Sequence, residues 1–302
     1  MILEPSVLFA RVFRTQLCSN LEYSFDDDPT RHATMVAGGS GFPAQLREFA
    51  ASLPFASKWE WAVRKFAAHV RPDAYLLRTD WQGDEPQAVT VYCRFPHEPD
   101  ANAFRDAVAQ ARPMGWSGPS TEAVARVLGA AGPRGIAFRV NPAGMLRTSV
   151  YFKLGADRAG LQAATCHDLV RLCGFGEEVA EEIIQDVASL YSPGPVGVIG
   201  LDDGGEGIPG SLKFDPANVV LQQARALLVR KGVPALPLAR VAHMAGLLRA
   251  RWLSYMGIKY GSSGFAGWRA YYSYEPFRLP PAGSFRIVSE RSPLPTLRLP
   301  HY

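Results

Sequence analysis

The sequence predicts an α+β fold, a ten-stranded antiparallel β-barrel made of five helix–helix–strand–strand repeats and surrounded by a ring of α-helices. Pairs of β-rich segments joined by short turns recur about every 60 residues along the chain. Segments with helical spacing of apolar residues, usually two at a time, lie between these pairs. Ten antiparallel strands in consecutive hairpins lose their exposed edges when they close into a barrel.

Five hairpins are expected, and the first is the least regular. The expected strand pairs are Ser19–Phe25 with Arg31–Ala37, Ala74–Thr79 with Ala88–Phe95, Gly135–Val140 with Leu146–Leu154, Val196–Leu201 with Ser211–Asp215, and Tyr255–Tyr260 with Trp268–Tyr274. The expected helices are Ala44–Ala50 with Lys58–Val70, Ala101–Ala111 with Thr121–Leu128, Arg158–Cys173 with Glu177–Tyr191, and Ala217–Lys231 with Leu236–Leu253. A barrel of ten strands is too wide for side chains alone to fill, so we expect a ligand in its interior.

The composition fits one domain of residues 1–302, with a Pro- and Arg-rich tail at 277–302 that either packs on the surface or a barrel mouth or is disordered. Hydrophobic residues make up 47% and the net charge is +4, which is too small to indicate nucleic-acid binding. The cysteines lack zinc-binding spacing, and no metal site is expected. No signal peptide or membrane-spanning segment is evident, so we expect a cytoplasmic protein.

Short strand sequences carry a pattern of charged residues and tyrosines. These are Asn20-Leu21-Glu22-Tyr23-Ser24, Thr90-Val91-Tyr92-Cys93-Arg94, Arg147-Thr148-Ser149-Val150-Tyr151 and Arg269-Ala270-Tyr271-Tyr272-Ser273-Tyr274. In this order they resemble strands of the aromatic prenyltransferases with the ABBA, or PT-barrel, fold. The likeness is greatest to the dimethylallyltryptophan synthase branch and the cyanobactin peptide prenyltransferases, and it covers about Asn20 to Phe277. Thr90 and Ser149 stand where related strands often have Lys.

The resemblance implies an enzyme that moves a dimethylallyl or geranyl group from its diphosphate to a Tyr, Trp or other nucleophilic side chain of a modified or cyclic peptide. Two alternatives stay open, a prenyltransferase acting on small indoles or phenols, and a barrel that binds a hydrophobic ligand without chemistry. The expected partners are the prenyl diphosphate donor and a peptide or aromatic acceptor, for a monomeric protein. No cofactor is required, and Mg²⁺ would at most assist diphosphate binding.

Glu22 is the expected general base, as the resemblance implies. It alternates with Leu21, Tyr23 and Phe25, which is the pattern of a strand with one apolar face and one face toward a cavity. Burial raises the pKa of a carboxyl group and makes it a better base. The alternative is a solvent-exposed Glu near the turn. The run Asp26-Asp27-Asp28 is interpreted as a solvated turn and not as a metal site.

Diphosphate binding without a metal requires several converging cations, supplemented by hydroxyl donors. The candidates are Arg31, Arg94, Arg147, Lys213, Tyr92 and Tyr151. Alternate strand residues share a face, so these side chains converge only if those faces point inward. The alternative for each arginine is a position on the outer face of the barrel.

Aromatic faces are expected to shield the allylic cation. Tyr272 and Tyr274 are the candidates for this shield, and the alternative is that Tyr271 and Arg269 of the same strand face inward instead. Gly197 and Gly200 are expected to leave room for a geranyl chain. The alternative is that these glycines serve strand twist or close packing.

Overall fold

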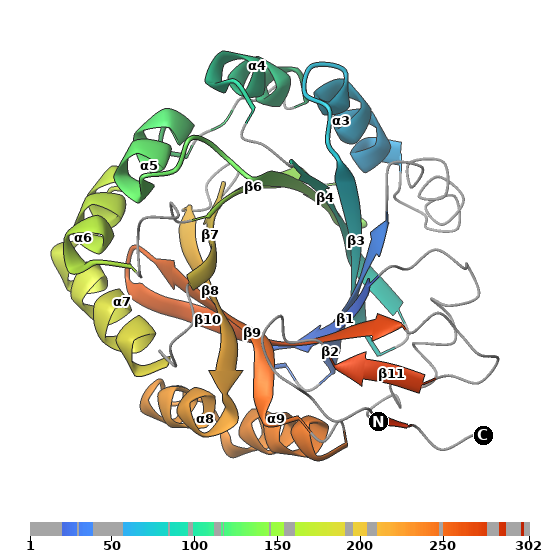
Figure 1. The fold of residues 1–302 in the computed structure, drawn as a ribbon, viewed down its shortest axis with the longest axis vertical. Helices are drawn as coiled ribbons and strands as arrows, with labels where there is room; N and C mark the ends of the chain where they lie inside the picture. Colours follow the sequence, from blue (N-terminus) through green and yellow to red (C-terminus); the bar gives the residue numbers. More distant parts are fainter. Residues whose placement is uncertain are drawn as a thin grey trace.

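The computed structural model describes residues 20–28, 30–38, 57–83, 85–95, 99–111, 116, 118–144, 146–153, 161–190, 196–203, 210–247, 250–276, 284–287 and 297–298. Within these residues the strands form a closed antiparallel barrel, and the helices lie outside it (Figure 1). The α+β barrel fold predicted from the sequence is therefore confirmed.

The barrel consists of ten strands in sequence order, and pairing of the first with the tenth closes it. The strands are β1 (Asn20–Phe25), β2 (Arg31–Gly38), β3 (Ala74–Gln82), β4 (Glu85–Arg94), β5 (Gly135–Val140), β6 (Leu146–Phe152), β7 (Val196–Asp202), β8 (Ser211–Val220), β9 (Trp252–Gly261) and β10 (Gly264–Pro276). Within the predicted tail, β11 (Ser284–Ile287) adds to β10, and β12 (Leu297–Arg298) adds to β11.

The outer layer contains the expected helices that fall within the described residues, with some ends shifted. It contains α3 (Ser57–Ala67), α4 (Ala101–Ala111), α5 (Thr121–Leu128), α6 (Ala163–Leu172), α7 (Glu177–Leu190), α8 (Leu221–Arg230) and α9 (Ala235–Leu247). Local signals set the ends of α5, where the Ser120 hydroxyl accepts from the Ala123 N–H and Gly129 ends the helix in a left-handed conformation. The expected helix Ala44–Ala50 lies outside the described residues. No described helix has an apolar stretch long enough to cross a bilayer.

Several boundaries differ from the prediction. The expected helix Leu236–Leu253 ends at Leu247, and Trp252 and Leu253 begin β9 instead, while β3 runs on from Thr79 to Gln82. Residues 217–220 were expected to open a helix, yet β8 continues through Pro216 to Val220 and pairs with β9. Asn218 has a φ of 55°, so the strand bends here and still keeps its partner. Val219 and Val220 are β-branched and favour a strand, and pairing with β9 keeps Ala217 in the strand as well.

The two faces of the barrel wall differ in chemistry. The helix-facing side is apolar and fully buried, as for Val91, Phe138, Val150 and Phe152. Phe138 of β5 packs edge-on against Phe66 of α3, with ring centroids 5.7 Å apart. Each fully buried apolar side chain of this size contributes about 1.5–3 kcal/mol to stability. This layer fixes strand parity, so the intervening residues face the barrel interior.

Candidate active site

The barrel interior is lined by charged residues and tyrosines. On β6 the interior residues Arg147, Ser149 and Tyr151 are partly exposed, while the alternate residues Thr148 and Val150 are buried. Partial exposure inside a closed barrel means that solvent-accessible space lies there. The residues that line it by register include the cations Arg78, Arg139, Arg147, Lys213, Lys259 and Arg269, the carboxylates Glu22, Asp80, Asp202 and Asp215, and the tyrosines Tyr92, Tyr151, Tyr255 and Tyr271.

Glu22 lies on this interior face and is only 7% exposed. In register it stands between Met35 of β2 and Ser273 of β10. Its neighbour Tyr23 points to the helices, where the Tyr23 hydroxyl accepts a hydrogen bond from Arg240 of α9. The alternation expected for this strand is therefore present, and it places a buried carboxyl group on the same interior face as the cations.

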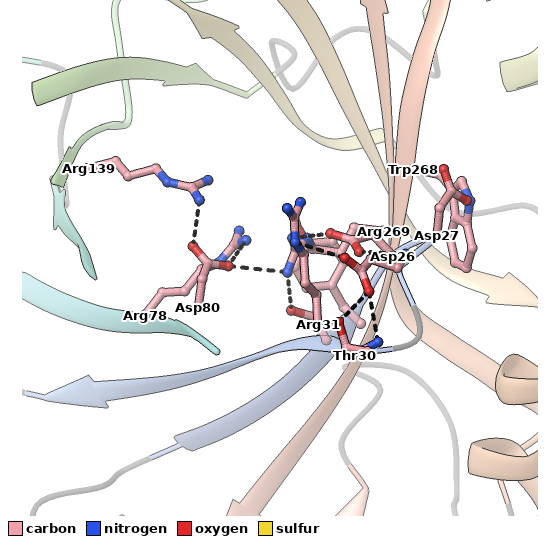
Figure 2. A network of polar contacts seen from close by, with 12 residues as sticks. Asp26, Asp27, Thr30, Arg31, Arg78, Asp80, Arg139, Trp268 and Arg269 are labelled. Carbon is pink, nitrogen blue, oxygen red and sulfur yellow. Dashed lines mark hydrogen bonds and ion pairs between the residues drawn. The ribbon is translucent and has the colours of Figure 1, made fainter. Parts of the chain in front are cut away.

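Three arginines from separate strands converge on one carboxylate; we call Arg78, Asp80, Arg139 and Arg269 the arginine cluster (Figure 2). Arg78 Nε donates to Asp80 Oδ1 at 3.0 Å, and Arg139 Nη2 lies 3.2 Å from Asp80 Oδ2. Arg269 Nη1 lies 3.4 Å from Asp80 Oδ1, while its Nη2 donates to Asp26 at 2.6 Å. Arg78, Asp80 and Arg139 were not among the candidates from the sequence, although alternation with the buried residues Leu77 and Phe138 would have placed Arg78 and Arg139 on the interior face of their strands.

The electrostatics of this cluster favour full ionisation of Asp80. Burial alone would raise the pKa of Asp80, but the charges of Arg78, Arg139 and Arg269 outweigh it and hold that pKa below its usual range. Burial and the neighbouring charge of Arg78 lower the pKa of Arg269. The guanidinium groups are thus crowded enough to repel one another, and Asp80 compensates that repulsion.

A second group, which we call the lysine–tyrosine cluster, comprises Tyr92, Tyr151, Lys213, Asp215 and Tyr271. Lys213 Nζ donates to the Tyr271 hydroxyl at 2.9 Å and lies 3.0 Å from Asp215 Oδ2. The rings of Tyr92 and Tyr151 are 5.7 Å apart. Burial would lower the pKa of Lys213, but Asp215 and the nearby tyrosines hold it above its ordinary value, so Lys213 is a buried ammonium group.

Asp202 of β7 contacts both Ser149 of β6 and Lys259 of β9. It accepts from the Ser149 hydroxyl at 2.6 Å and pairs with Lys259 Nζ at 2.8 Å. Ser149 therefore binds a carboxylate at the position where related strands often carry Lys. Arg147, two residues before Ser149, is partly exposed and forms no ion pair with a described carboxylate. It is accordingly open to an anionic ligand.

The three arginines proposed from the sequence are not brought together. Arg31 is the first residue of β2, its side chain is 58% exposed, and it pairs with Asp28 in the hairpin turn. Arg94 is the exposed last residue of β4, at the opposite end of the barrel. Arg147 alone stands beside the other interior cations, directly across from Arg139. Lys213, Tyr92 and Tyr151 are brought together as expected.

The final strand has the opposite parity to that proposed for Tyr272. Tyr272 is 1% exposed on the helix-facing side, where it stacks on Phe25 and donates its hydroxyl to the carbonyl of Val241 in α9. Tyr271 and Arg269 face the interior instead. Tyr274 lies opposite Leu21 in register, and its side chain is outside the described part of the structure. Tyr271 therefore replaces Tyr272 as the interior tyrosine of this strand.

Gly200 faces the interior without leaving a void. A Cβ atom at this position would lie 3.1 Å from the Tyr151 ring and 3.4 Å from Lys213 Cβ. The space is already used by those two side chains, so the structure favours close packing over room for a longer prenyl chain. Gly197 lies at the irregular start of β7, where the register shifts between Val196 and Val198.

The acidic turn after β1 is held by specific contacts. The Asp28 carboxylate caps its own turn by accepting from the N–H of Thr30 at 2.8 Å. Asp26 binds Arg269, and Asp27 accepts a hydrogen bond from the indole N–H of Trp268. Two of the three residues thus tie this hairpin to β10. Among the described residues, no set of three or more His, Cys, Asp and Glu side chains is arranged to hold a metal ion.

The arrangement of strands and helices is shared with solved aromatic prenyltransferases. A 5-dimethylallyltryptophan synthase from Streptomyces coelicolor has a TM-score of 0.55 at 16% identity, over 83% of this chain and 79% of that one. A 6-dimethylallyltryptophan synthase from Micromonospora olivasterospora, in complex with DMASPP and Trp, has a TM-score of 0.52 at 16% identity, and the match covers 83% of this chain and 80% of that one. NotF, in complex with brevianamide F and DMSPP, has a TM-score of 0.57 at 11% identity, and the match covers 83% of this chain and 78% of that one.

No protein-family model matches the sequence, and no curated protein matches it. At these low identities the likeness to solved structures establishes the fold. The chain has the PT-barrel fold of the ABBA-type aromatic prenyltransferases, as the strand motifs of the sequence predicted.

Proposed function

We propose that the protein is a prenyltransferase that moves a prenyl group from its diphosphate to an aromatic acceptor. The observation that carries this proposal is the interior face itself, on which cations, tyrosines and the buried carboxyl group of Glu22 gather inside an otherwise apolar barrel wall. Structures with the same fold are described as complexes with DMASPP or DMSPP and with Trp or brevianamide F, which supports this class of donor and acceptor.

The proposed reaction begins with loss of the diphosphate. The C–O bond between the allylic carbon and the diphosphate breaks, and its electron pair leaves with the diphosphate oxygen. Arg147, Lys213 and the arginine cluster neutralise the departing charge, so the reaction needs no resident metal ion. Preorganised charges of this kind stabilise the developing charge without having to reorganise during the reaction.

The second half of the reaction is attack on the cation. The faces of Tyr92, Tyr151 and Tyr271 stabilise the allylic cation, each by about 0.5–2 kcal/mol depending on desolvation. An electron-rich carbon or heteroatom of the acceptor forms the new bond to the allylic carbon. Glu22 then takes the proton that the acceptor loses.

The test is release of pyrophosphate from dimethylallyl diphosphate in the presence of tryptophan or of Trp- and Tyr-containing peptides, linear and cyclic. We expect release together with a product heavier by one dimethylallyl group. The resemblance to the cyanobactin peptide prenyltransferases implies a peptide side chain as the acceptor, and turnover of free tryptophan alone would instead indicate a small-molecule enzyme. Tight donor binding with no release under any condition would contradict catalysis and indicate a binding barrel.

A further inference from the structure

Asp80 is the point at which the arginine cluster is joined. Oδ1 of Asp80 accepts hydrogen bonds from Arg78 and Arg269, and Oδ2 lies at an ion-pair distance of 3.2 Å from Arg139 Nη2. The three arginines come from β5, from β10 and from the same strand as Asp80, and none of these strands is a neighbour of another. Figure 2 shows Arg139 and Arg269 reaching the carboxylate from different sides. No backbone pairing holds these guanidinium groups together.

We propose that Asp80 is a positioning residue that holds Arg78, Arg139 and Arg269 together as one anion-binding site for the diphosphate. This inference rests on the proposed function, because it assigns the cluster to the diphosphate of the donor. Asp80 would act through the arginines and would not touch the substrate.

The arginines keep donors available for a ligand. A guanidinium group has five N–H donors, and Arg139 uses a single nitrogen in its contact with Asp80 while its side chain remains 46% exposed. Arg78, by contrast, is 9% exposed and donates to Asp80 through two nitrogens. Arg78 is therefore the fixed member of the cluster, and Arg139 is the member best placed to bind an incoming anion.

Removing the charge of Asp80 has two opposite consequences. It makes the interior more positive, and by Coulomb's law alone pyrophosphate would bind more tightly. It also leaves Arg78 buried without its partner and lets three like charges repel one another. If Asp80 positions the arginines, the second effect dominates and binding weakens, so the sign of the change distinguishes positioning from charge alone.

The experiment measures inorganic pyrophosphate binding to the full chain by isothermal titration calorimetry. We expect Asp80→Asn to weaken binding about tenfold, a loss typical of removing a residue that orients a binding group. Asp80→Glu keeps the charge and should restore part of the affinity. Asp202→Asn is the matched control, because it neutralises an interior carboxylate that pairs with one lysine and not with three guanidinium groups. Affinity that is unchanged or higher in Asp80→Asn, or an equal loss in Asp202→Asn, would overturn the proposal.

A second variant keeps the test independent of folding. Arg139→Gln changes a half-exposed side chain and should weaken pyrophosphate binding by a similar factor. In the double variant the loss of binding free energy should be smaller than the sum of the losses in the two single variants, because Asp80 acts partly through Arg139. Unchanged affinity in Arg139→Gln, or full additivity, overturns the assignment to this cluster. Failure of the unmodified chain to bind pyrophosphate would refute the proposed function itself, and the inference with it.

Discussion

The two clusters of the barrel interior differ in how their buried positive charges are paired with carboxylates. In the arginine cluster Asp80 contacts three guanidinium groups, and even with Asp26, which pairs with Arg269, positive charge is in excess. In the lysine–tyrosine cluster Lys213 has its own carboxylate, Asp215, and a phenol hydroxyl. Forked arginines can share an anion and still offer donors to another, whereas an ammonium group is a single point charge.

This difference separates the two tasks of the proposed reaction. An excess of guanidinium groups suits a multiply charged diphosphate. The lysine–tyrosine cluster suits the end of the donor where the C–O bond breaks. There the aromatic rings stabilise the allylic cation, Lys213 meets the departing oxygen, and Asp215 balances the lysine charge that would otherwise repel the cation. The comparison therefore predicts that changes in the two clusters alter different steps.

Glu22 lies outside both clusters, and its substitution should have the largest effect. Glu22→Gln keeps the shape of the side chain and removes the base, so we expect transfer to fall about 10²–10⁴-fold. The measurement is the rate of product formation, with the thermal midpoint and donor binding as controls. Turnover close to that of the unmodified chain would reject the role of Glu22.

Substitution of Lys213 should have the second largest effect, because Lys213 contacts both the carboxylate Asp215 and the hydroxyl of Tyr271 in its cluster. Lys213→Met leaves Asp215, which is 8% exposed, without its cation. We expect kcat/KM for the donor to fall about 10²-fold, as when one preorganised charge-stabilising group is lost. Lys259→Met is the matched control, because Lys259 is 41% exposed and Asp202 keeps its serine donors. Equal losses in both variants would remove the distinction we draw between these lysines.

Adjacent tyrosines of β10 test the parity of that strand. Tyr271→Phe removes a hydroxyl bound by Lys213, and kcat should fall about tenfold, the usual scale for a hydrogen bond to a charged group. Tyr272→Phe should instead lower the free energy of unfolding by about 1 kcal/mol through loss of its bond to Val241 and leave kcat largely intact. The reverse pattern in kinetics and denaturant unfolding would show that the strand faces the other way.

The smallest effect is expected at Gly200. In Gly200→Ala the new methyl group meets the Tyr151 ring at 3.1 Å, so that ring must shift slightly. We expect a loss of a few-fold in kcat/KM that is similar for dimethylallyl and geranyl diphosphate, since strain of this size is about 1 kcal/mol. Selective loss of geranyl transfer would instead support the view that Gly200 provides room for the longer chain.

Sequence periodicity was sufficient for the architecture. Alternating apolar residues, as in Val89, Val91 and Cys93, show which strand face meets the helices, and turn residues show where each hairpin ends. Both signals are local, so they can be read without knowing the fold. The same alternation placed Glu22, Tyr92 and Tyr151 on one side of their strands, and the resemblance to PT-barrel strands gave them roles.

Only the tertiary structure decided which charges meet. The sequence proposed the same role for Arg31, Arg94 and Arg147, but Arg31 and Arg94 lie at opposite ends of the barrel from one another. Two consecutive tyrosines, Tyr271 and Tyr272, could not be told apart until the contacts of Tyr272 with α9 fixed the parity of β10. A local pattern determines the face of a strand, whereas register and closure determine its neighbours. The meeting of three arginines at Asp80 depends on strands that are far apart in the chain and is therefore a property of the closed barrel.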